Sequence, residues 1–145
     1  DLMELRLLLE VRVAGLAASR ATDEDIARIR QLLDEVTDSG TDLARRAPAD
    51  VALHDAIASA SRNSFFQAIL EALSQVLTEE RRQGGELVQA GGSNHDESDY
   101  QHERLVQAIE ARDPVRASDA ARDIVERAWR LLSSATADSD AAKAP

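Results

Sequence analysis

Apolar residues recur along most of the chain at steps of three and four, the spacing that places them on one face of an α-helix. The first stripe consists of Leu2, Leu5, Leu9, Val13 and Leu16. Other apolar residues widen this stripe, so we expect the first helix to lie at the centre of the fold. No segment shows the two-residue alternation of a β-strand. The pattern therefore predicts an all-α fold, an antiparallel bundle of about six helices.

Capping residues and prolines mark the predicted helix boundaries in the first half of the chain. The run TDED at 22–25 predicts the start of the second helix, because acidic side chains are favoured at the positive end of the helix dipole. The pair SG at 39–40 predicts the end of this helix. Residues 42–47 are expected to connect it to a third helix, with Pro48 in the first turn, where a proline is tolerated.

The second half of the chain predicts three more helices. Asn63 or Ser64 is expected to cap the fourth helix. Glycine pairs within residues 84–92 bracket the one long loop. Ser98 is expected to cap the fifth helix, and Pro114 is expected to open the sixth.

Composition narrows the classes of protein. The chain has 145 residues, of which 43% are hydrophobic and 30% are charged, so it is globular rather than disordered. Lys and Arg total 17 against 27 Asp and Glu, giving a formal charge of −10. This balance argues against nucleic acid as a direct partner, because phosphate binding needs a basic face. Without cysteine, the chain has no disulfide, thiol nucleophile or Cys-ligated metal.

Length and hydropathy predict one cytoplasmic domain. We assign residues 1–134 to this domain and residues 135–145, which are rich in Ala, Ser and Asp, to a flexible tail. No apolar run approaches the length of a membrane span, and no signal peptide opens the chain. The chain starts at Asp1 rather than at a methionine, which indicates a piece of a longer protein.

Three polar residues fall on apolar helix faces. Asp50 and His54 share the face of the third helix that carries Leu53 and Ile57. A carboxylate and an imidazole at positions i and i+4 point the same way and lie close enough to coordinate one cation. His102 lies on the apolar stripe of the fifth helix, so a second histidine faces the interior.

These residues have two interpretations. Asp50, His54 and His102 suit the first coordination shell of a divalent metal, with positions left open for water or a substrate oxygen. Imidazole suits Zn, Ni, Cu or Fe, so the set does not identify the metal. Alternatively, the Asp–His pair is an ion pair at the edge of the core and His102 is a hydrogen-bonded core histidine. His95 is interpreted as a solvated loop residue and is not counted as a ligand.

Arg6 interrupts the apolar first helix one turn before Glu10. One interpretation is an exposed side chain, or a pair with Glu10 at i, i+4 spacing. The other is a cation aimed into a cavity, where a guanidinium can bind a carboxylate with two hydrogen bonds.

Several short motifs follow one another in an order typical of one family. The segments are ELRLLLE at 4–10, AGLAA at 14–18, DVALH at 50–54, ASRN at 60–63 and HERLVQAIEARD at 102–113. Together they resemble the FCD domain, the effector-binding C-terminal domain of the FadR subfamily of GntR-type bacterial transcription regulators. The resemblance covers about residues 1 to 132, with Leu53 replacing the usual Phe of the D-x-x-F-H signature.

The resemblance implies a metal site. Many members of this family bind a divalent metal through an Asp and three His, and Asp50, His54 and His102 match three of these positions. The fourth ligand would fall near residue 124, which is Ile124 here, with Asp123 before it. Either three ligands hold the metal, or Asp123 substitutes after a local shift, or the site has lost its metal. Zn, Ni and Mn are not distinguished.

The resemblance also implies a function. Family members sense small organic acids at or beside the metal, and Arg6 corresponds to a first-helix arginine that can engage an acidic effector. A winged-helix DNA-binding domain precedes this domain in the family and is absent from this chain. We therefore expect an effector-sensing and dimerisation domain, a homodimer without membrane contact, in which effector binding alters helix packing and operator binding by the attached winged helices.

Other classes of protein stay open on sequence alone. A small helical metal-dependent hydrolase or lyase would use the same three ligands, although Glu103, the acid beside His102, lies about 100° around the helix. A metal-free sensor of acyl-type ligands and a purely structural dimerisation domain are the remaining alternatives. The sequence identifies neither the effector nor the target genes, nor whether the regulator represses or activates.

Overall fold

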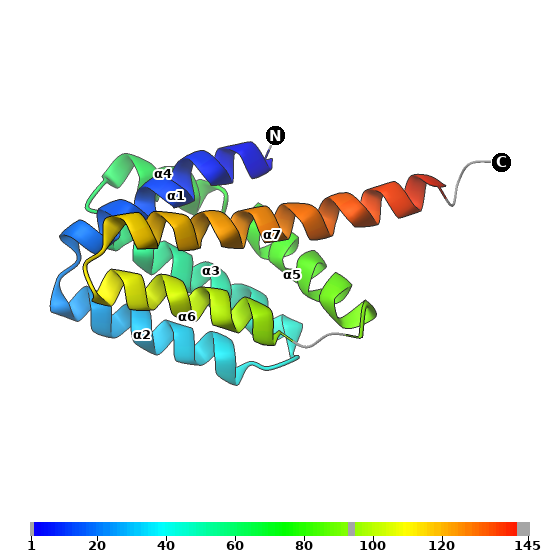
Figure 1. The fold of residues 1–145 in the computed structure, drawn as a ribbon, viewed down its shortest axis with the longest axis horizontal. Helices are drawn as coiled ribbons and strands as arrows, with labels where there is room; N and C mark the ends of the chain where they lie inside the picture. The colour runs from blue at the N-terminus through cyan, green and yellow to red at the C-terminus, as the bar shows by residue number, and fades with distance from the viewer. Residues whose placement is uncertain (1, 93–94, 142–145) are drawn as a thin grey trace.

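The computed structural model describes the backbone of residues 2–92 and 95–141 and the side chains of these residues up to 135. These residues form seven helices and no strand (Figure 1), which confirms the predicted all-α class. The helices are α1 (Leu2–Arg20), α2 (Asp23–Asp38), α3 (Leu43–Ala60), α4 (Ser64–Ala72), α5 (Ser74–Ala90), α6 (Asp96–Glu110) and α7 (Pro114–Ala141).

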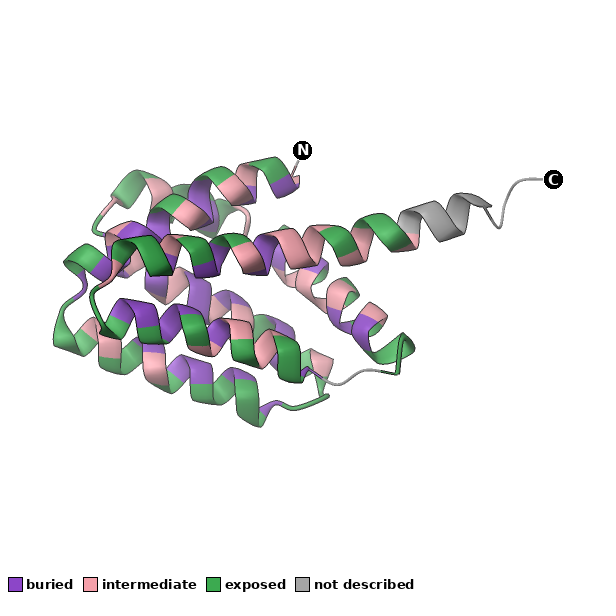
Figure 2. Cartoon of the chain, viewed as in Figure 1, coloured by how far each residue is buried: buried purple, intermediate pink, exposed green. Residues whose placement is uncertain are grey.

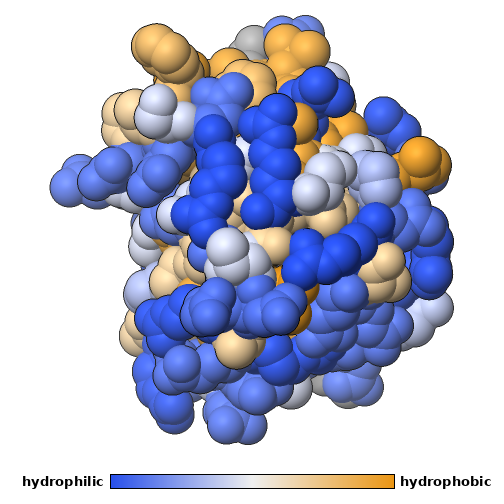
Figure 3. Space-filling model, turned by 90° about the vertical axis from the view of Figure 1, so that its left-hand side faces the viewer, coloured by the Kyte–Doolittle hydropathy of each residue, from blue (hydrophilic) through white to orange (hydrophobic). Residues whose placement is uncertain are grey.

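The helices pack in pairs around one core. α1 packs most extensively against α7, α2 against α3, and α6 against α7. α5 crosses from α3 to α7, so α1, α3, α5, α6 and α7 surround one end of the core (Figure 1). The end that carries the α1–α2 and α6–α7 turns is mostly hydrophilic (Figure 3).

Aliphatic side chains and alanines form the core, as expected for a chain with 3% aromatic residues. Leu53 and Ile57 of α3 and Leu105 and Ile109 of α6 are almost fully buried. α1 is buried along much of its length (Figure 2), which agrees with its expected central position. None of the described helices is both long and apolar enough to span a membrane.

Three predicted helix starts are confirmed. Thr22 caps α2 through a capping box, in which its side chain accepts from the backbone of Asp25 and its own N–H donates to the Asp25 carboxylate. Asn63 caps α4 by accepting from the first backbone N–H groups of that helix. Pro114 is the first residue of α7.

The connecting segment predicted over residues 42–47 is wrong, because α3 already begins at Leu43. Asp42 caps the helix by accepting from the backbone N–H of Ala44 and Arg45. Pro48 therefore lies inside α3 and leaves one carbonyl of the preceding turn without its intrahelical donor. The early start places residues 43–47 beside the cavity described below.

The fourth helix and the loop after it also differ from the prediction. The helix is divided at Leu73 into α4 and α5, which gives seven helices instead of six. α5 then continues through Gly84 and Gly85, where a loop was expected. A Cβ atom on Gly85 would lie 2.5 Å from Leu43 Cδ2, so this glycine permits close packing of α5 on α3.

The last two helices are longer than predicted. α6 begins at Asp96, so Ser98 lies in its first turn and is not the cap. α7 continues to Ala141, past the expected last turn near residue 132. The boundary at residue 134 and the tail over 135–145 stay predictions, and residues 142–145 lie outside the described residues.

Two glycines provide a matched test of the packing. In Gly15→Ala, the new Cβ would lie 2.6 Å from Ser118 Oγ and 3.2 Å from the Pro114 carbonyl oxygen. We expect a loss of about 1–3 kcal/mol of unfolding free energy from this overpacking. Gly84→Ala meets no atom within 4 Å and should gain about 0.5–1 kcal/mol from the higher helix propensity of alanine. Urea unfolding of both variants checks the prediction; a stabilised Gly15→Ala protein would contradict it.

Candidate metal and ligand site

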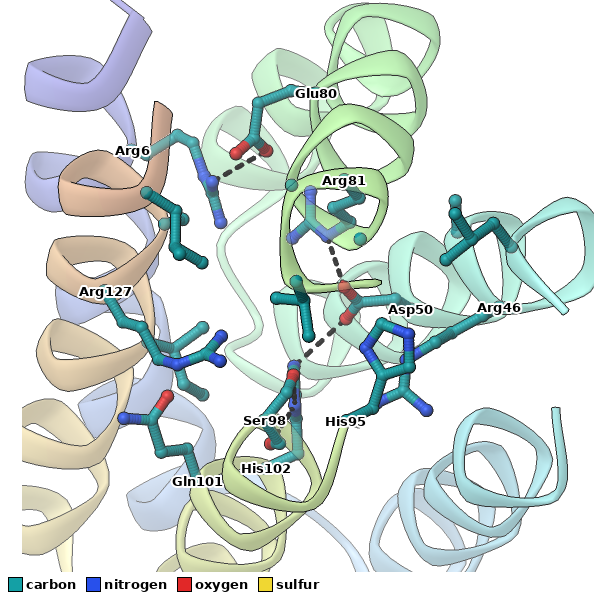
Figure 4. Close-up of a pocket in the computed structure, with 18 residues that line it drawn as sticks. Arg6, Arg46, Asp50, Glu80, Arg81, His95, Ser98, Gln101, His102 and Arg127 are labelled. Carbon is teal, nitrogen blue, oxygen red and sulfur yellow. Dashed lines mark hydrogen bonds and ion pairs between the residues drawn. The ribbon is translucent and has the colours of Figure 1, made fainter. Parts of the chain in front are cut away.

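A cavity of about 80 Å³ lies where α3, α5, α6 and α7 meet near the first turns of α1 (Figure 4). This volume holds several water molecules or one small ligand. Its wall carries four arginines and two acidic residues, in a chain of net charge −10. The charged wall residues are Arg6, Arg46, Asp50, Glu80, Arg81 and Arg127.

The three predicted metal ligands lie together, and two of them, Asp50 and His102, line this cavity. Asp50 and His54 are one turn apart on α3, and His102 faces them from α6. Asp50 Oδ1 lies 3.1 Å from His102 Nε2 and 3.4 Å from His54 Nε2, and the two Nε2 atoms are 3.4 Å apart. Among the described residues, they are the group of acidic, His or Cys side chains whose ligand atoms converge within 4.8 Å.

Each of these side chains is oriented through its other polar atom. His54 Nδ1 lies 3.0 Å from Glu10 Oε2, and His102 Nδ1 lies 2.7 Å from the carbonyl oxygen of Ser98. Both acceptors favour a proton on Nδ1 of the histidine, which leaves a lone pair on its Nε2 atom. Asp50 Oδ2 accepts from Arg81 Nε at 2.9 Å, and the buried Oδ1 atom has no hydrogen-bond donor in the described part of the chain.

This donor set fits a divalent cation. With both imidazoles protonated on Nδ1, their Nε2 atoms and Asp50 Oδ1 converge as three acceptor atoms, and such an arrangement is stabilised by a positive charge. Ligands about 2.1 Å from one metal would lie about 3.0 to 3.4 Å apart in octahedral or tetrahedral geometry, which brackets the spacing found here.

The position of the family's fourth ligand contributes no ligand atom. Ile124 is buried and lines the cavity with an apolar side chain. Asp123 lies outside the site, where its carboxylate accepts from Arg104 at 3.0 Å. The described structure therefore brings together three ligands and leaves Asp123 apart from them.

The buried charges near the triad shift one another's pKa values. Burial opposes ionisation of Asp50, but Arg81 and His102 hold its pKa well below the usual value. Glu10 follows the same pattern, with Arg6, His54 and Arg81 outweighing burial to lower its pKa. Burial and Arg81 disfavour the protonated form of His54, yet Glu10 and Asp50 outweigh them and raise its pKa.

Arg6 is buried, with 2% of its side chain exposed, so the interpretation as an exposed residue is wrong. Its Nε donates to Glu10 at 2.6 Å, as the i, i+4 spacing indicated, and its Nη1 donates to Glu80 at 2.8 Å. Burial opposes the charge on Arg6, but the two carboxylates raise its pKa. Arg6 lines the cavity while both acids hold its guanidinium, and its predicted role in effector binding is not established by this placement.

Sequence reasoning missed two residues of α5. Arg81 is 6% exposed in its side chain, and its Nη1 and Nη2 atoms have no hydrogen-bond partner among the described residues. Glu80 is also buried, and burial raises its pKa against the effect of Arg6. The sequence contained a signal, because Glu80 and Arg81 follow the buried Leu77 at steps of three and four.

His95 lies in the wall of the cavity, so its prediction as a solvated loop residue is wrong. α6 starts directly after His95, and the His95 ring packs beside Gly85. A Cβ atom added to Gly85 would lie 3.6 Å from His95 Cε1. The prediction failed because α5 continues through its glycines, and this continuation places His95 against that helix.

The fold and the site define an all-α domain with a buried acid–histidine cluster at a cationic cavity. Residues 1–127 match the FCD domain, and the chain belongs to this family.

Known relatives agree with this membership. The chain is 32% identical over 121 residues to the transcriptional regulator LutR of Bacillus subtilis, covering 83% of this chain and 55% of LutR. It is 34% identical over 136 residues to the transcriptional repressor NanR of Cronobacter sakazakii, and the match covers 90% of this chain and 50% of NanR. The solved structure of Streptococcus agalactiae GntR is similar with a TM-score of 0.74 at 27% identity, covering 90% of this chain and 57% of that one. The chain thus spans about half the length of the relatives it matches.

Proposed function

We propose that this chain is the effector-binding and dimerisation domain of a DNA-binding transcription regulator of the GntR type. The effector is a small organic acid that binds in the cavity beside a divalent metal held by Asp50, His54 and His102. A homodimer would contact DNA in the cytoplasm through winged helices attached to this domain. The similarity to regulators named for transcription supports this assignment over the other classes.

One observation carries the proposal: Asp50 and Arg81, which are bonded to each other through Oδ2 and Nε, both line the cavity and both keep other polar atoms without a hydrogen bond. Asp50 Oδ1 is a buried acceptor without a hydrogen-bond donor, and Arg81 Nη1 and Nη2 are buried donors without a hydrogen-bond acceptor, although Nη2 lies 3.7 Å from Glu10 Oε2. A metal ion and an acid together satisfy both groups, whereas either alone leaves one group unpaired.

The roles of the chain's own residues follow from these contacts. Glu10 and the Ser98 carbonyl orient the two imidazoles, and Arg81 fixes the Asp50 carboxylate through its Nε. The Nη atoms of Arg81 remain to pair with a carboxylate, a geometry for which guanidinium is suited. When bound, the metal would supply a Lewis acid with open coordination positions for oxygen ligands.

Regulation requires that the acid binds one helix arrangement more tightly than another. Arg81 lies on α5 and Asp50 on α3, so a ligand that pairs with Arg81 acts on the contact between these helices. A coupling of about 1–3 kcal/mol is typical for such switches.

For the alternative of a hydrolase or lyase, the acid considered in the sequence was Glu103, the neighbour of His102. Glu103 binds Arg30 at 2.7 Å, and this hydrogen bond lowers the pKa of Glu103. It is therefore engaged away from the triad. This placement favours a binding domain over an enzyme.

Thermal unfolding of the Zn-loaded and the metal-free chain tests the proposal. We expect one or more short carboxylic acids, with glycolate and lactate as the first probes, to stabilise the loaded protein. A ligand at 100 times its Kd adds about 2.7 kcal/mol to the unfolding free energy. The metal-free protein should show no such gain. Equal stabilisation with and without metal, or none with any acid, would contradict the proposal.

Two neighbouring arginines on α5 test the role of Arg81. Arg81→Lys keeps a cation beside Asp50 but loses the paired Nη donors, so we expect the Kd for the acid to rise at least about tenfold. Arg82→Lys is the matched control, because Arg82 is 41% exposed in its side chain and pairs with Glu79 and Glu86. Isothermal titration calorimetry on Zn-loaded samples measures both values. Similar affinities for the two variants would exclude Arg81 as the carboxylate partner.

A further inference from the structure

A second group of cationic and imidazole side chains lines the same cavity away from Arg6 and Glu80 (Figure 4). Arg46 comes from α3, His95 precedes the first residue of α6, and Arg127 comes from α7. Three separate elements therefore bring these side chains to one cavity, with Arg127 across from His95 and Arg46 in the view of Figure 4. The metal triad and Arg81 do not use any of them.

Two of these three side chains lack a bonded partner. Arg46 pairs with Asp99 and also donates to the carbonyl of Val36. His95 is 5% exposed, and its Nε2 has no hydrogen-bond partner among the described residues. Arg127 makes no hydrogen bond or ion pair with the residues that the structure describes. Glu97 provides the main favourable charge near it.

Asp99 and Glu97 compensate the positive charge of this group only in part. Burial, Arg46 and Arg127 lower the pKa of His95. Burial, Arg130 and Arg46 lower the pKa of Arg127. Each positive charge therefore makes the next one less favourable, and an anion between them would relieve this repulsion.

We propose that His95 and Arg127 form a second anion subsite, and that the effector is a short dicarboxylic acid. This inference rests on the proposed function, in which Arg81 and the metal side of the cavity take the first carboxylate. The second carboxylate accepts from Arg127 and from a ring N–H of His95, while Arg46 adds positive charge. The small cavity volume restricts the ligand to a short acid.

A monocarboxylate of the same length would leave the second subsite unpaired. His95 Nε2 is buried, so leaving it without an acceptor disfavours binding, and sites built around hydrogen bonds reject analogues that lack the bonding group. The structure thus predicts selectivity for the second acidic group, in addition to any affinity for the first.

Malate and 2-hydroxybutyrate form a matched pair of probes, because both have four carbons and a 2-hydroxyl group and only malate has the second carboxylate. We expect Zn-loaded wild-type protein to bind malate at least tenfold more tightly than 2-hydroxybutyrate in isothermal titration calorimetry. Arg127→Gln should bring the two Kd values within threefold of each other. Arg130→Gln is the control, because it removes a charge from an exposed position of the same helix and should keep the preference.

The outcomes separate this inference from the proposed function. Equal, metal-dependent binding of both acids by the wild type would overturn the second subsite and leave the proposed function intact. A preference for malate that survives in Arg127→Gln would also overturn it. Failure of these and all other acids to bind a protein with full metal content would overturn both. The metal content and melting temperature of each variant, measured on the same samples, establish that a lost preference does not reflect unfolding.

Discussion

Replacing Arg6 by methionine is expected to lower the free energy of unfolding by about 3–5 kcal/mol. The substitution keeps most of the side-chain volume but leaves Glu10 and Glu80 buried without their cation. Removing one member of a buried ion cluster has a large effect because the remaining charges are not solvated. A loss of this size corresponds to a fall in melting temperature on the order of 10 °C for a domain of this length.

Arg12→Met is the matched control, because Arg12 is exposed on the same helix and its replacement should change stability by about 0.5 kcal/mol or less. Replacing the orphaned acids together with Arg6, in the triple variant Arg6→Met, Glu10→Gln and Glu80→Gln, should recover part of the loss. Guanidinium unfolding measures all three proteins. An Arg6→Met protein as stable as the control would contradict a buried ion cluster and would favour a solvent-facing Arg6.

His102→Ala is expected to weaken zinc binding by at least about 100-fold. Substituting residues that only orient a ligand costs 10- to 100-fold in metal affinity, and removal of a direct ligand exceeds that range. His102 supplies one of three ligand atoms, and Asp50 and His54 alone leave a two-ligand site. Competition with a chromogenic chelator measures the affinity.

Glu103→Ala is the control for this variant, because Glu103 neighbours His102 in sequence and binds Arg30 instead of the triad. It should keep wild-type zinc affinity. A similar affinity in His102→Ala and in the wild type would show that zinc binds elsewhere on this acidic protein.

Local sequence signals predicted the fold where local chemistry decides the structure. The capping box at Thr22 and the Asn63 cap are satisfied by neighbouring backbone groups, so sequence alone identifies them. The glycines at 84 and 85 misled the prediction, because their conformation is decided by the distant Leu43. Tertiary packing keeps them helical although glycine has a low helix propensity.

The convergence of Asp50, His54 and His102 was predictable for a similar reason. Asp50 and His54 share a helix face by their spacing, and His102 lies on an apolar stripe. The burial of Arg81 was not predictable, because Arg81 lies in a charged run that resembles a solvated helix end. The burial of His95 depends on where α5 ends and α6 begins, and helix boundaries are the least certain part of a sequence-based prediction.

The metal content of the purified chain tests the central claim most directly. The protein is prepared without an affinity tag and without exposure to a nickel column, and it is measured by elemental analysis beside His54→Ala. We predict close to one divalent metal per wild-type chain and almost none in the variant. Absence of metal from the wild type, even after incubation with Zn, Ni and Mn, would contradict the account.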